Sequence, residues 1–68
     1  MLFEVALIEH PKPKDAEENG ALEKIILEPT CVVARDAQAA SVMVVLNNKD
    51  KIECDMSRLQ VLVRPFAP

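Results

Sequence analysis

Two prolines inside strand-like segments constrain the fold of this chain more than any other feature of its sequence. Three segments are rich in apolar and β-branched residues, namely 2–10, 22–35 and 59–66. Pro29 lies within the second segment and Pro65 near the end of the third, whereas the first segment contains no proline. Because proline has no N–H to donate to a β-ladder, it is found mainly at the edges of sheets. We therefore expect segment 2–10 to be the central strand, with the other two segments at the edges.

Segment 36–47 is predicted to be a helix, although positions 41–46 would also suit a buried strand. Asp36 is a favourable N-cap, and the alanines and the glutamine that follow it are good helix formers. The competing interpretation is a β-hairpin, in which the apolar run 42–46 pairs with the residues after it. In the helix, four side chains lie along one stripe at helical spacing and are expected to face the core: Ala39, Ala40, Met43 and Leu46.

Together these elements predict a single α+β domain that covers residues 1–68. Its order is β-β-α-β, with a three-stranded sheet of order 2-1-3 and one helix packed on one face. The first strand is antiparallel to the second, and the helical crossover returns the third strand parallel to the second, as in half of a ferredoxin-like unit. Segment 11–21, which holds two prolines, a charge cluster and the only glycine, is expected to be a solvated loop.

A single helix leaves one face of this sheet uncovered, and an apolar surface of that kind normally marks an interaction site. Both faces of the first strand carry apolar side chains, so the pattern does not decide which face the helix covers. Arg64 is either a surface arginine whose stem covers apolar area or an anchor of an interface. We expect a protein partner or a homo-oligomer, with these candidate interface residues: Phe3, Val5, Ile8, Leu62, Arg64 and Phe66.

Composition and charge argue against other kinds of partner. The net charge is −3, tryptophan and tyrosine are absent, and the basic residues are scattered along the chain. Nucleic-acid binding normally needs a basic patch or stacking aromatic side chains. No apolar run approaches the roughly 20 residues that a membrane span requires. The start of the chain also lacks a signal-peptide pattern. We therefore expect no nucleic-acid partner, no membrane partner, and an intracellular or virion-borne protein.

Patterns for catalysis or metal binding are weak. His10 is the only histidine and is interpreted as a surface residue at a strand end. Cys31 and Cys54 are expected to be buried or half-buried free thiols. A zinc site needs about four ligands, which this set does not supply. We expect no catalytic residue, no metal site and no cofactor, and a thiol or hydrolytic enzyme is only a remote alternative.

Three stretches of the chain carry a resemblance to known proteins: LFEVALIEHPKPK, EPTCVVARDAQAA and QVLVRPF. They resemble a group of small tailed-bacteriophage proteins of unassigned function, over nearly the whole chain. The sequence departs from that group in its valine-rich helix and in NNKDKIECDM, which replaces an Ile-Pro followed by acidic and aromatic residues.

The resemblance implies a non-enzymatic phage accessory protein in the virion or in the host cytoplasm, and it carries over no functional residues. A small capsid-decoration or tail subunit is the first interpretation. An early host-directed protein that binds and inhibits a bacterial factor is the alternative.

Overall fold

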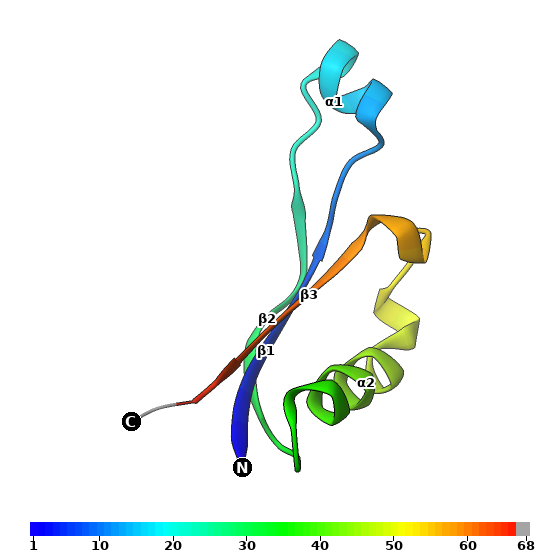
Figure 1. Ribbon diagram of the computed structural model, residues 1–68. Helices are drawn as coiled ribbons and strands as arrows, with labels where there is room; N and C mark the ends of the chain where they lie inside the picture. Colours follow the sequence, from blue (N-terminus) through cyan, green and yellow to red (C-terminus); the bar gives the residue numbers. More distant parts are fainter. Residues whose placement is uncertain (67–68) are drawn as a thin grey trace.

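The structure, a computed structural model, describes residues 1–66 and is built on a three-stranded sheet (Figure 1). Its strands are β1 (Leu2–Glu9), β2 (Lys24–Val33) and β3 (Leu59–Pro65), and its helices are α1 (Pro13–Asn19) and α2 (Ala37–Asn47). Short 3-10 turns at Lys49–Lys51 and Met56–Arg58 connect α2 to β3. The strand order is β2-β1-β3, and β1 is antiparallel to both neighbours. The prediction of a small α+β fold with a sheet of order 2-1-3 is confirmed.

Both edge strands carry a proline, in agreement with the argument that placed them at the edges. The N–H of Phe66 donates to the Leu2 carbonyl, and the N–H of His10 donates to the Arg58 carbonyl. In an antiparallel ladder, hydrogen-bonded and non-hydrogen-bonded pairs alternate, so Pro65, next to the hydrogen-bonded Phe66, does not bond to β1. Its main-chain nitrogen faces the free edge of the sheet, where no strand requires a donor. On β2, the register shifts between the partners of Val5 and Leu7, and Pro29 lies in this irregular stretch. Each edge therefore has a position that cannot donate to an added strand.

The core lies between β1 and α2. Phe3, Val5 and Leu7 alternate along one face of β1 and are almost completely buried. The helix contributes two small side chains, Ala40 and Val44, to the same cluster. Because small side chains allow a helix to approach a sheet closely, α2 packs on β1 and β3 together. This thin core is made mostly by one strand and one helix.

Helix α2 begins after Asp36, whose carboxylate accepts a hydrogen bond from the N–H of Ala39 at 2.7 Å, as an N-cap does. The predicted inward stripe is wrong in part, because Met43 and Leu46 are exposed and Val44 takes the central buried position. The run 42–46 is apolar all round the helix, so periodicity could not determine which side faces the sheet.

The predicted loop at 11–21 contains a short helix, α1, so the chain order is β-α-β-α-β instead of the predicted β-β-α-β. Pro13 occupies the first turn of the helix. N–H groups in the first turn have no acceptor within the helix, so the absence of an N–H on proline costs nothing there. Gly20 has a φ of 65° and ends the helix in the left-handed conformation that glycine adopts without strain. No residue of α1 is buried, and the helix lies at the far end of the β1–β2 hairpin, away from α2 (Figure 1).

We expect the substitution Leu7→Ala to lower the free energy of unfolding by about 3 kcal/mol, because it leaves a cavity at a fully buried position. The matched control is Leu22→Ala, which removes the same atoms from a side chain that is 86% exposed. Urea denaturation followed by circular dichroism measures both changes. Equal losses of stability in the two variants would contradict the position of the core.

Candidate functional site

The candidate site is the face of the sheet opposite α2, which we call the open face. Even-numbered residues of β1 and β3 point to this face, since side chains alternate along a strand. Cross-strand partners share a face, so the register adds the residues of β2 that pair with Leu2, Glu4 and Ile8. The open face consists of Leu2, Glu4, Ala6 and Ile8 of β1, Ile25, Cys31 and Val33 of β2, Gln60, Leu62 and Arg64 of β3, and Phe66 beyond it.

The open face is largely apolar and exposed. All three strands contribute large hydrophobic side chains that are between 38% and 72% exposed: Leu2, Ile25, Val33 and Leu62, with Phe66 beyond β3. In the part of the chain that the structure describes, neither helix covers this face (Figure 1). A contiguous apolar surface drawn from every strand of a sheet is typical of a surface that another molecule covers.

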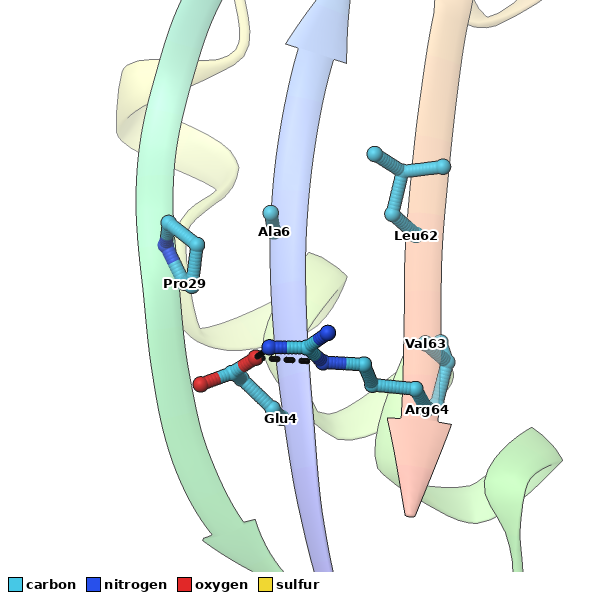
Figure 2. A pocket seen from close by; sticks show the side chains of 6 residues that line it. All are labelled: Glu4, Ala6, Pro29, Leu62, Val63 and Arg64. Atoms are coloured by element: carbon cyan, nitrogen blue, oxygen red, sulfur yellow. Dashed lines mark hydrogen bonds and ion pairs between the residues drawn. The ribbon is translucent and has the colours of Figure 1, made fainter. Parts of the chain in front are cut away.

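A shallow hollow of about 450 Å³ lies near the middle of the open face (Figure 2). Ala6 lies on β1 in its centre, Leu62 stands beside it on β3, and Pro29 borders it from β2. Glu4 and Arg64 close one end. The hollow exists because the small side chain of Ala6 is flanked by larger neighbours on both adjacent strands.

Glu4 and Arg64 form an ion pair across β1 and β3. They are direct partners in the ladder, and the Nε atom of Arg64 donates to the Oε1 atom of Glu4 at 2.6 Å. The Nη2 atom of Arg64 contacts the same oxygen. The side chain of Glu4 is 19% exposed and that of Arg64 is 76% exposed. The guanidinium therefore covers the carboxylate and turns its own outer side to solvent.

The structure places four of the six sequence candidates on the open face, namely Ile8, Leu62, Arg64 and Phe66. Phe3 and Val5 are on the other face and are only 3% and 0% exposed, because α2 packs on them. They belong to the core, and the candidate surface is corrected to exclude them. Both faces of β1 are partly apolar, so the sequence did not indicate which one the helix would cover.

Sequence reasoning missed the roles of Glu4 and Ala6. Strand alternation places both on the same face as Ile8, but their partners depend on the register between β1 and β3, which pairs Glu4 with Arg64 and Ala6 with Leu62. The usable signal was that Glu4 is the only acid on the open-face side of the central strand and Arg64 is the only base on the last strand. Opposite charges at directly facing positions favour that register.

A second polar cluster joins the far ends of β1 and β3. The Nε2 atom of His10 lies 2.5 Å from the Oε1 atom of Gln60, and its Nδ1 atom lies 3.4 Å from a carboxylate oxygen of Glu23. Arg58 donates to the His10 carbonyl at 3.2 Å and lies 3.6 Å from the Glu9 carboxylate. These contacts fix the start of β3 against the end of β1, which is a structural role.

The two cysteines are free thiols in different environments. Cys54 is half-buried, as predicted, between the two 3-10 turns. Cys31 is exposed, which corrects the expectation of a buried or half-buried thiol. The reason is its position on an edge strand, opposite Glu4, on the face that α2 does not cover.

We expect the Glu4–Arg64 pair to contribute a coupling free energy of about 0.5 to 1 kcal/mol to folding, because one partner is well exposed. A double-mutant cycle with Glu4→Gln and Arg64→Gln, followed by urea denaturation, measures this energy. The coupling should fall in molar salt, which screens exposed charges. A coupling that is zero at low salt would contradict the ion pair.

Within residues 1–66, no helix is long and apolar enough to cross a membrane. In the same range, no three side chains of His, Cys, Asp or Glu gather closely enough to hold a metal ion. Comparisons with protein-family models, with curated proteins and with solved structures give no match to this chain. The functional argument therefore rests on the geometry of the open face.

Proposed function

We propose that this protein is a non-enzymatic binding subunit whose contact surface is the open face. One observation carries the proposal: α2 packs on one side of the sheet, while exposed apolar side chains from all three strands surround the Glu4–Arg64 pair on the other. In the free chain these apolar groups stay in water. Burial in a complex contributes favourable free energy roughly in proportion to the apolar area covered.

The make-up of the open face supports this role. The centres of protein interfaces are enriched in aromatic residues and arginine and depleted of other charged residues. Phe66 and Arg64 lie together on this face, Glu4 pairs with Arg64, and the exposed large side chains around them, Leu2 and Leu62, are aliphatic. The sheet edges are less suitable for a partner, because Pro29 and Pro65 remove donors that an added strand would need.

The resemblance to small tailed-phage proteins supplies the setting of the proposal. The chain would be an accessory subunit of the capsid or tail, and its open face would make the protein contact on which its assembly into the particle depends. A host-directed protein that binds and inhibits a bacterial factor would use the same face, and the location of the protein separates the two roles.

We expect quantitative mass spectrometry of purified particles of the encoding phage to find the chain at a fixed stoichiometry to the major capsid or tail protein. Incorporation at a fixed ratio follows from binding to repeated sites on the particle. Absence from particles, together with recovery of a single bacterial protein on the tagged chain, would contradict the virion role and favour the inhibitor.

We expect Leu62→Arg to abolish incorporation, because it places a charge in the centre of the open face. The matched control is Val42→Arg, which adds the same charge to the exposed side of α2 at a residue of similar exposure. Circular dichroism checks that both variants fold. If both variants are incorporated like the natural chain, the open face is not the contact surface.

A further inference from the structure

We propose that the occupant of the open face is a second copy of this chain, bound face to face about a two-fold axis. This inference rests on the proposed function and names the partner. The axis lies in the interface, runs parallel to the strands and passes between β1 and β3. Each subunit then places its β1 over the β3 of its partner, as in two aligned sheets packed about 10 Å apart.

The charges on the open face are complementary under this axis. Glu4 and Arg64 are directly opposite each other in the ladder, so the axis exchanges their positions. The ladder position of each acid therefore comes to lie over the ladder position of the partner's base. Two N–H groups of Arg64 are used within the chain, and its exposed outer side still has N–H groups to donate. A hydrogen bond from this outer side to the partner's carboxylate would offset part of the cost of removing the charges from water.

The shapes are complementary under the same axis. Ala6 pairs with Leu62 in the ladder, so the axis places the protruding Leu62 of one subunit over the hollow at Ala6 of the other. Leu2 and Phe66, which are joined by a main-chain hydrogen bond, also exchange positions. A single axis thus pairs acid with base, large with small, and apolar with apolar. An isologous interface requires this kind of self-complementarity.

The chain also exposes more surface than a compact monomer of its mass. The solvent-accessible surface is 5003 Å² for a chain of 7.5 kDa. A compact monomer of that mass exposes about 4,250 Å². The excess is about 750 Å², close to the roughly 800 Å² that each partner buries in a standard interface. The elongated shape of the chain, 42 × 24 × 15 Å with the α1 hairpin protruding, contributes to this excess (Figure 1).

The first test is the mass in solution, measured by sedimentation velocity from micromolar to near-millimolar concentration. We expect a concentration-dependent change from 7.5 kDa to twice that mass. Ala6→Arg, which fills the hollow, should weaken the dimer by at least about 30-fold, as expected for the loss of a central contact. The control Val42→Arg, on the exposed side of α2, should leave the dissociation constant unchanged.

The decisive test is rescue in trans. The variant Glu4→Arg carries two bases at the paired positions, and Arg64→Glu carries two acids, so each variant should be monomeric alone. When the two are mixed, every base faces an acid across the axis, and a heterodimer should form. Loss of the ion pair within one chain cannot produce this rescue. Circular dichroism of each variant alone establishes that it is folded.

The outcomes separate this inference from the proposed function. A natural chain that stays monomeric at every concentration overturns the second copy as occupant, as does a dimer that Ala6→Arg leaves intact. Mixed variants that fail to associate also overturn it. If the second copy is overturned but Leu62→Arg still abolishes incorporation into particles, the proposed function stands with a different partner. If Leu62→Arg also leaves incorporation into particles unchanged, both the dimer and the proposed function are overturned.

Discussion

The eleven-residue helix α2 can cover only one face of the three-stranded sheet, and the remaining properties of the molecule depend on this limit. The covered face holds Phe3, Val5 and Leu7, which form the core with Ala40 and Val44. The other face of the same strand holds Leu2, Glu4, Ala6 and Ile8. Side chains one position apart on β1 therefore lie on opposite faces, one set in the core and the other on the open face, where we propose that a partner binds.

The ion pair with Arg64 stabilises the charged Glu4 side chain on the central strand of this sheet. A carboxylate on the central strand, with apolar neighbours around it, loses part of its hydration and needs a partner. Arg64 supplies that partner from the adjacent strand and covers the carboxylate with its guanidinium.

The sequence predicted the sheet because its strongest signals are local. Pro29 and Pro65 act on their own strands, and the three β-rich runs need no knowledge of the tertiary structure. Asp36 likewise marks the start of α2 through a contact only three residues away. The short helix α1 was missed because Pro13 and Gly20 were interpreted as loop residues, although proline in a first turn and glycine after a last turn also delimit a helix.

The surface was harder to predict because it depends on non-local choices. Phe3 and Ile8 both look like candidates in the sequence, and only the position of α2 buries the first and leaves the second on the open face. For the same reason, Met43 and Leu46 could not be distinguished from Val44 on a helix that is apolar all round. The pairing of Glu4 with Arg64 needs the register between residues that are 60 positions apart in the chain.

A thin core and a large open face also link folding to association. Leu7 and Val5 are the largest side chains that are fully buried, so the core of the isolated chain provides little margin of stability. A complex that covers the open face stabilises the folded chain by mass action, and its effect grows with the concentration of the partner. Substitutions in the core then weaken both the fold and the complex. A substitution at Leu62, which is 42% exposed and outside the core cluster, is expected to act on the proposed complex more than on the isolated fold.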